Sequence, residues 1–111
     1  MNYNYEIRIT RTEDDSEIFS MKLPENLKVV SSYLFDIDKM GEWVLEGIVE
    51  VLSGKSDSAE RDGNFFGCQI RKNFAKIADL FEQGYWCEIE TIELKELVEI
   101  WIAEKRKFDK K

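Results

Sequence analysis

The N-terminal part of the chain alternates between apolar and polar residues, which is the pattern of a half-buried β-strand. Every second residue from Tyr3 to Ile9 is apolar within a stretch that runs to Thr12, and a second alternating stretch covers residues 17–23. The polar residues 12–16 between them suit a turn. Pro24 ends the second stretch because proline cannot donate a hydrogen bond to a neighbouring strand. The pattern therefore predicts an N-terminal β-hairpin.

From about Asp36 the apolar residues recur at steps of three and four, as on one side of an α-helix. Either Asp36 or Asp38 is expected to cap the start of this helix. Ser53-Gly54 is expected to end it, since glycine is favoured just after a helix. The residues between Pro24 and this helix are compatible with a strand or with a short helix. The apolar stripe contains Ile37, Met40, Val44, Ile48 and Val51.

The second half of the chain returns to short alternating segments before a final helix. Residues 54–63 are polar and charged, and we expect them to form a mobile loop. Strands are predicted at residues 64–71, 74–81 and 85–90, although the apolar spacing of the second also suits a short helix. Thr91 is expected to cap the final helix. The apolar stripe of that helix contains Leu94, Leu97, Val98, Trp101 and Ile102.

The predicted elements occur in the order ββ-α-βββ-α. Consecutive strands joined by short turns indicate an antiparallel sheet, here of about five strands. Two amphipathic helices would cover one face of it, which gives a two-layer α+β fold. The length of 111 residues fits a single domain spanning residues 1–111, and the hydrophobic content of 43% is sufficient for one core.

The charge of the chain favours a basic protein as its partner. Asp and Glu number 23 against 16 Lys and Arg, so the formal net charge is −7. Such a field repels nucleic acid phosphates and speeds encounter with basic proteins. Nucleic acid is therefore an unfavoured partner.

The sequence contains no secretory signal and no apolar stretch of membrane-spanning length. We expect a cytoplasmic protein that has no membrane partner and whose two cysteines, Cys68 and Cys87, are reduced. Both cysteines fall on the apolar side of a predicted strand, which is typical of buried structural thiols.

The chain lacks the residues from which catalytic sites are usually built. It has no histidine, which removes the commonest general base and metal ligand and leaves the two cysteines without an activating imidazole. The glutamates spaced at four in residues 42–50 lie opposite the apolar stripe, as expected of a solvated helix face. We therefore predict that the protein is not an enzyme and needs no cofactor or metal.

What remains is a surface for binding a partner. A protein that binds a basic partner would present acidic clusters, which attract the partner, and exposed aromatic side chains, which provide affinity. The hairpin turn and the loop after the first helix supply such acids, and the last predicted strand supplies two adjacent aromatic residues. The predicted partner-binding residues are Glu13, Asp14, Asp15, Asp57, Glu60, Asp62, Tyr85 and Trp86.

Two stretches together resemble a known family. One is Val51-Leu52-Ser53-Gly54-Lys55, followed by Gly63-Asn64. The other runs from Thr91 through Leu94-Lys95-Glu96-Leu97 to Trp101, and continues through Glu104-Lys105 to Phe108. In these stretches the chain resembles small bacterial immunity proteins encoded beside polymorphic or contact-dependent growth inhibition toxins. The resemblance implies a cytoplasmic protein that binds and neutralises a cognate toxin domain, often a nuclease, without a cofactor.

Three other functions are compatible with the sequence. An acidic mimic of DNA would need carboxylates spaced regularly along one face, whereas the acids here form clusters. A dimerisation module would form a homodimer through an exposed edge strand such as residues 3–12. A small enzyme that uses only carboxylates would need a pocket with converging acids.

Overall fold

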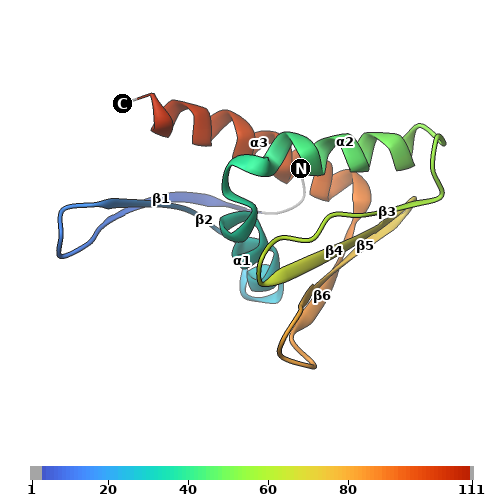
Figure 1. Ribbon diagram of the computed structural model, residues 1–111, viewed down its shortest axis with the longest axis horizontal. Helices are drawn as coiled ribbons and strands as arrows, with labels where there is room; N and C mark the ends of the chain where they lie inside the picture. The colour runs from blue at the N-terminus through green and yellow to red at the C-terminus, as the bar shows by residue number, and fades with distance from the viewer. Residues whose placement is uncertain (1–3, 111) are drawn as a thin grey trace.

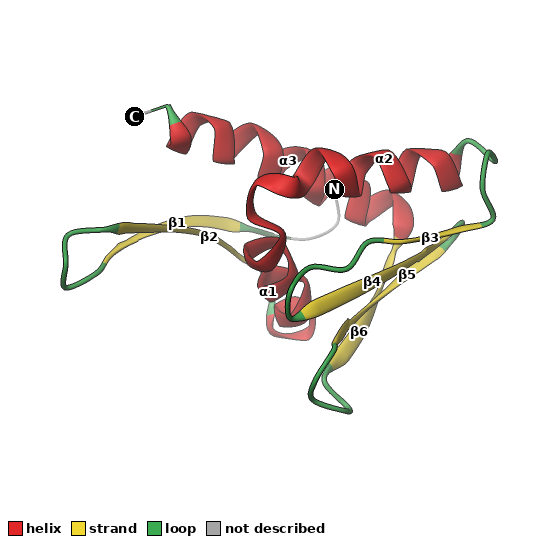
Figure 2. Cartoon of the chain, viewed as in Figure 1, coloured by secondary structure: helices red, strands yellow, loops and turns green. Residues whose placement is uncertain are grey.

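The computed structural model describes residues 4–110 and confirms the α+β class. The predicted N-terminal strand is observed from Glu6, and Tyr3 lies outside the described residues. Three α-helices, two short 3-10 helices and six strands are present in the described range (Figures 1 and 2). In chain order they are β1 (Glu6–Arg11), β2 (Glu17–Lys22), η1 (Glu25–Leu27), α1 (Lys28–Ile37), η2 (Asp38–Met40), α2 (Gly41–Leu52), β3 (Ser58–Glu60), β4 (Phe66–Arg71), β5 (Phe74–Asp79), β6 (Trp86–Glu90) and α3 (Thr91–Asp109).

The N-terminal hairpin forms as predicted and projects from the rest of the molecule as an arm (Figure 1). Its antiparallel register places Ile7 opposite Met21 and Ile9 opposite Phe19. The Phe19 ring packs between Trp101 and Phe108 of α3, with ring centroids 5.1 and 5.2 Å away. The base of the arm is thus anchored in the core, while its far end extends into solvent.

The strands form two sheets instead of the single predicted sheet of about five. The hairpin is a separate two-stranded sheet, and the other four strands form an antiparallel sheet in the order β3-β4-β5-β6. The hairpin remains separate because β2 packs against α1 and α3. Strand β3 lies within the segment that we expected to be a mobile loop, and it pairs with the end of β4.

Arg61 and Gly47 together hold β3 against α2. The Arg61 guanidinium donates from Nε to the Trp43 carbonyl of α2 at 3.1 Å and lies 5.1 Å from the Trp43 ring. Gly47 makes room for it, since a Cβ there would lie 2.8 Å from Arg61 Nε. The glycine that weakens α2 intrinsically therefore lets this arginine attach β3 to the helix.

The helix predicted from about Asp36 corresponds to α2, and the residues after Pro24, which were compatible with a strand or a short helix, form η1 and α1. The backbone reverses at Asp38, whose φ of 49° ends α1. Trp101 Nε1 donates to the Asp38 carbonyl at 2.9 Å, and Lys105 pairs with the Asp38 carboxylate at 3.0 Å. Neither Asp36 nor Asp38 caps α2 with its side chain, contrary to expectation, because Asp36 belongs to α1 and α2 begins only at Gly41.

The final helix agrees closely with the prediction, apart from its first residue. Glu90 occupies the N-cap position that we expected for Thr91. The Thr91 hydroxyl instead donates to the Arg71 carbonyl at 2.5 Å, and its N–H donates to the Asn73 carbonyl at 3.0 Å. Thr91 therefore ties the helix to the β4–β5 turn. Apolar residues of the stripe that become buried are Leu94, Leu97, Val98 and Trp101.

The helices pack on one face of the four-stranded sheet and leave the other face open (Figure 1). Alternate residues of the strands enter the core, among them Cys68, Ile77 and Ile89. Most of the intervening residues are exposed to solvent, whereas Gly67 is buried and Ala78 is half-buried. On this outer face the register aligns Glu60, Gln69, Lys76 and Glu88 in one row across the four strands.

Candidate partner-binding site

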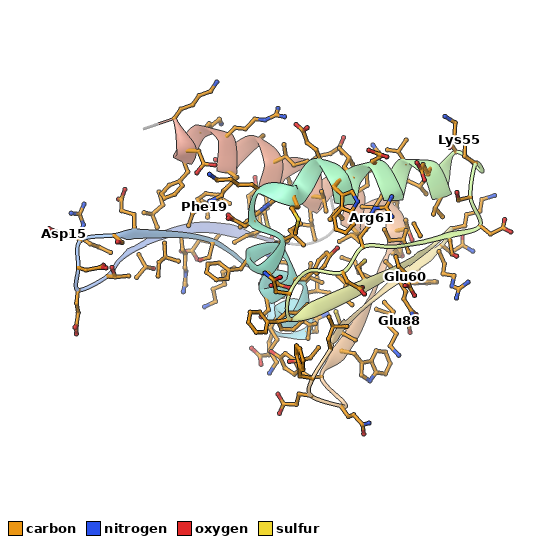
Figure 3. The ribbon with its side chains drawn as sticks, viewed as in Figure 1. Asp15, Phe19, Lys55, Glu60, Arg61 and Glu88 are labelled. Carbon is orange, nitrogen blue, oxygen red and sulfur yellow. The ribbon has the colours of Figure 1, made fainter. Side chains whose placement is uncertain are left out.

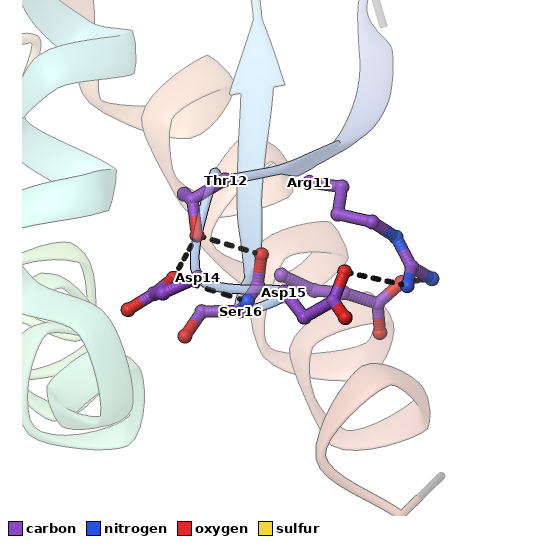
Figure 4. Close-up of polar contacts among 6 residues, drawn as sticks. Arg11, Thr12, Asp14, Asp15 and Ser16 are labelled. Carbon is purple, nitrogen blue, oxygen red and sulfur yellow. Dashed lines mark hydrogen bonds and ion pairs between the residues drawn. The ribbon is translucent and has the colours of Figure 1, made fainter.

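The first predicted acidic cluster lies at the tip of the hairpin arm (Figure 4). The Asp14 carboxylate accepts hydrogen bonds from the Thr12 hydroxyl and, at 3.2 Å, from the Ser16 N–H. The bond from Thr12 is the largest of the effects that lower the pKa of Asp14. Asp15 adopts a φ of 66° and pairs with Arg11 at 3.5 Å. All three acids at the tip are exposed, and Asp14 and Asp15 also stabilise the turn.

The second predicted cluster lies on and beside β3. Asp57 and Glu60 are exposed, Asp57 just before β3 and Glu60 on the outer face of the sheet. Asp62 lies near the start of β4, where a Cβ on Gly67 would be 2.6 Å from Asp62 Oδ1. Figure 3 shows Asp15 at the end of the arm and Glu60 over the sheet, so the two clusters occupy different parts of the molecule.

The two predicted aromatic residues have different environments. Tyr85 is half-buried, with its ring 6.2 Å from that of Phe66. Trp86 is 49% exposed on the outer face of β6, and Lys76 Nζ lies 4.7 Å from its ring centroid. Trp86 is thus the aromatic side chain of this pair that is accessible to a partner.

The cysteine thiols are free and are separated by strand β5. Cys68 and Cys87 both lie opposite Ile77 in the register, one on each side of it. Neighbouring strands are about 4.8 Å apart, so two strand spacings exceed the reach of a disulfide. Burial raises the pKa of the Cys68 thiol to about 12 and raises that of Cys87 as well. Cys68 is buried as predicted, whereas Cys87 is only half-buried.

The structure reveals an exposed aromatic surface that the sequence pattern did not indicate. It lies at the end of the four-stranded sheet where the residues just before β4 meet the turn between β5 and β6. We call this surface the aromatic end, and it consists of Phe65, Leu80 and Phe81. Phe81 is 78% exposed and Phe65 61%, the two highest values among large hydrophobic side chains in the described range. Their ring centroids are 6.3 Å apart.

The backbone of the aromatic end is held by two aspartates. Asp36 of α1 accepts hydrogen bonds from the N–H groups of Phe65 and Phe66, both at 2.9 Å. Asp79 Oδ1 accepts from the N–H groups of Phe81 and Glu82 at 2.8 and 2.9 Å. A further bond from Leu80 N–H to the Phe65 carbonyl, at 2.9 Å, joins the two segments.

A groove with a volume of about 970 Å³ runs from the hairpin arm to the aromatic end. Its apolar lining includes Ile18, Phe35 and Phe65. Its charged lining has both signs, with cations such as Lys28 and acids such as Asp36. The Lys28 ammonium pairs with Glu25 at 3.0 Å.

Within residues 4–110, no group of three or more His, Cys, Asp or Glu side chains is arranged to hold a metal ion. None of the helices in that range combines the length and apolarity needed to cross a membrane.

Comparison with known proteins identifies the family. A protein of Bacillus cereus named immunity protein is 37% identical to this chain over 94 residues, which cover 81% of the chain and 80% of the relative. The chain belongs to this family of immunity proteins. No family model matches the chain. No solved structure matches it.

Membership of this family confirms the predicted resemblance to immunity proteins. The aromatic end could have been located from the positions of its phenylalanines beside glycine-containing turns. Phe65-Phe66 lies between Gly63-Asn64 and Gly67, and Phe81 precedes Glu82-Gln83-Gly84. Large aromatic side chains beside turns have no strand or helix stripe to join, so they are candidates for exposure.

Proposed function

We propose that this chain protects its host cell by binding and neutralising a cognate toxin domain, and that this domain is a basic nuclease. The observation that carries the proposal is the 37% identity with a protein named immunity protein over four-fifths of both chains. The inhibitor would act in the cytoplasm as a binding protein and not as an enzyme, within a polymorphic or contact-dependent growth inhibition system.

The charge of the chain supports a basic target. A formal net charge of −7 gives long-range attraction to a cationic protein, and oppositely charged partners associate faster than neutral ones. Nucleases carry cationic surfaces because their substrates are polyanions. An acidic inhibitor would therefore be attracted to the same surface that the nucleic acid uses.

Co-expression tests the proposal directly. The toxin domain encoded beside this chain is induced in a bacterial host with and without the chain, and growth and nucleic acid integrity are followed. We expect growth arrest and degraded DNA or RNA with the toxin alone, and recovery of both when the chain is present. Growth arrest that persists in the presence of folded chain would contradict the immunity function. Arrest with intact nucleic acid would contradict only the nuclease assignment.

A further inference from the structure

We propose that the aromatic end, Phe65, Leu80 and Phe81, is the docking surface for cationic side chains of the toxin domain; this inference rests on the proposed function. Phe81 and Phe65 are 78% and 61% exposed, although burying an aromatic side chain is strongly favourable. They contribute little to the core of the free chain. A partner that buries these side chains would gain binding free energy, because their apolar surface is exposed to water in the free protein.

The rigidity of the backbone distinguishes this surface from an ordinary exposed loop. The carboxylates of Asp36 and Asp79 together accept four backbone N–H bonds at 2.8 to 2.9 Å. The bond from Leu80 N–H to the Phe65 carbonyl keeps the two segments in register. A phenylalanine side chain has only two rotatable bonds, so binding to this surface loses little conformational entropy.

The surrounding charges select a cationic occupant. Asp36 and Asp79 lie under the two aromatic segments, Glu82 follows Phe81, and Asp62 lies against Gly67 together with Leu80. Two cations lie nearby: Arg61 is directed toward α2, where it lies 5.1 Å from the Trp43 ring, and Lys28 of the groove is paired with Glu25 at 3.0 Å. Aromatic faces attract guanidinium and ammonium groups, and carboxylates nearby strengthen that preference. Phosphate or an acidic peptide would be repelled here.

The two regions that the sequence pattern suggested are less suited to this role. At the hairpin tip, Asp14 bonds with Thr12 and Ser16, and Asp15 pairs with Arg11. On the outer face of the sheet, the exposed Trp86 ring already has Lys76 Nζ at 4.7 Å. A cation from the partner would have to displace Arg11 from Asp15 or Lys76 from the Trp86 ring, whereas both rings of the aromatic end remain accessible.

Calorimetric titration with the toxin domain encoded beside this chain, inactivated at its catalytic residues, tests the inference. We expect the Phe65→Ala/Phe81→Ala variant to bind at least a hundredfold more weakly than the natural chain. Phe74→Ala is the matched control, because Phe74 is 52% exposed on β5 outside the aromatic end. It should bind within threefold of the natural chain.

A second variant covers the case in which the double substitution unfolds the chain. Phe81→Lys changes only the most exposed ring and places a positive charge before Glu82, so it should weaken binding at least tenfold while circular dichroism remains native. Equal affinity of the folded aromatic variants and the natural chain would overturn the inference while leaving the immunity function intact. Absence of any binding by the natural chain would overturn both. A dimer of the natural chain in sedimentation that Phe81→Lys dissociates would assign this surface to a second copy and would also overturn the inference.

Discussion

The Asp36 carboxylate accepts hydrogen bonds at 2.9 Å from the backbone N–H groups of Phe65 and Phe66, which follow it by 29 and 30 residues. Asp36 lies in the last turn of α1, so these bonds fasten the helix to the start of β4. Gly63 is the residue that permits this approach, because a Cβ at that position would collide with the Asp36 carboxylate. The position of the aromatic end therefore depends on a contact between distant parts of the chain.

Replacing Asp36 by alanine should lower the free energy of unfolding by about 1–3 kcal/mol. The substitution removes two charge-assisted hydrogen bonds, and one of the two N–H donors, that of Phe66, is partly buried. Urea unfolding monitored by circular dichroism measures the change. Asp57→Ala serves as the control, since Asp57 is exposed and lies just before β3. It should change stability by less than about 0.5 kcal/mol.

The same contact can be tested from its other side. Gly63→Ala should also destabilise the chain, because the new Cβ forces the Asp36 carboxylate away from its two donors. In the Asp36→Ala background the collision is removed, so Gly63→Ala should cost much less there. Additive effects of the two substitutions would show that Gly63 acts independently of Asp36.

Local patterns predicted the elements whose periodicity agrees with their packing. The period of two in the second strand places Phe19 and Met21 on one side, and both are buried against the core. The helical stripe that includes Leu97 and Trp101 is likewise buried. In these segments the side that carries the apolar residues is also the side that packs against the core. The local sequence pattern is therefore sufficient to predict both the element and its buried side.

The features that sequence reasoning missed depend on long-range contacts. The reversal at Asp38, which separates α1 from α2 near the predicted start of the helix, is fixed by Trp101 and Lys105 of α3. Local spacing cannot show this, because the apolar steps continue through the break. Phe81 was assigned to a strand for a similar reason: its apolar character fits the pattern, whereas the Asp79 carboxylate holds its N–H in the following turn.

Substituting Gly47 by alanine should not give the stabilisation expected in a helix interior. Alanine is about 1 kcal/mol better than glycine in a helix. Here its Cβ would lie 2.8 Å from Arg61 Nε and would displace the guanidinium from the Trp43 carbonyl and ring. We expect the Gly47→Ala chain to be no more stable than the natural chain in thermal unfolding, and β3 to become more susceptible to proteolysis.

The comparison with an Arg61→Ala background isolates the cause. Without the guanidinium, Gly47→Ala should stabilise the chain by about 1 kcal/mol, as in an unconstrained helix. The coupling between the two sites should therefore be about 1 kcal/mol or more. The same change in stability in both backgrounds would contradict the proposed role of Gly47 as space for Arg61.

Stability should fall as the pH rises above about 9. Burial raises the pKa of Cys68 to about 12, and that of Tyr33 above its ordinary value, whereas both groups ionise more readily in the unfolded chain. A group whose pKa is higher in the folded state than in the unfolded state contributes its full stability at pH values below its pKa in the unfolded state. That contribution is lost as the pH rises toward the folded pKa, because the unfolded state then binds fewer protons. For Cys68 the window runs from about 9 to about 12.

Urea unfolding at a series of alkaline pH values checks this dependence. A single fully shifted group contributes a slope of about 1.4 kcal/mol per pH unit within its window. Cys68→Ala removes one such group, so the variant should be less stable at neutral pH but should lose stability less steeply between pH 9 and 12. Identical slopes for the variant and the natural chain would show that Cys68 is not buried as a neutral thiol.

Acidic residues at the hairpin tip are predicted to affect the rate at which the toxin is captured. The Glu13→Gln/Asp15→Asn variant removes two charges, and asparagine tolerates the left-handed conformation that Asp15 adopts at φ 66°. Long-range attraction acts before contact, so association at low salt should slow severalfold while dissociation stays nearly unchanged. Stopped-flow mixing with inactivated toxin domain over a range of salt concentrations measures both rates.

The second acidic cluster supplies the matched comparison for the tip. Asp57→Asn/Glu60→Gln also removes two charges, from the β3 side of the sheet. If net charge alone guides encounter, both double variants should slow association equally, whereas a larger effect of one would show which side approaches the toxin first. A dissociation rate that rises severalfold in the tip variant, with association unchanged, would instead mean that Glu13 or Asp15 touches the toxin in the complex. Steering by the tip would then be wrong.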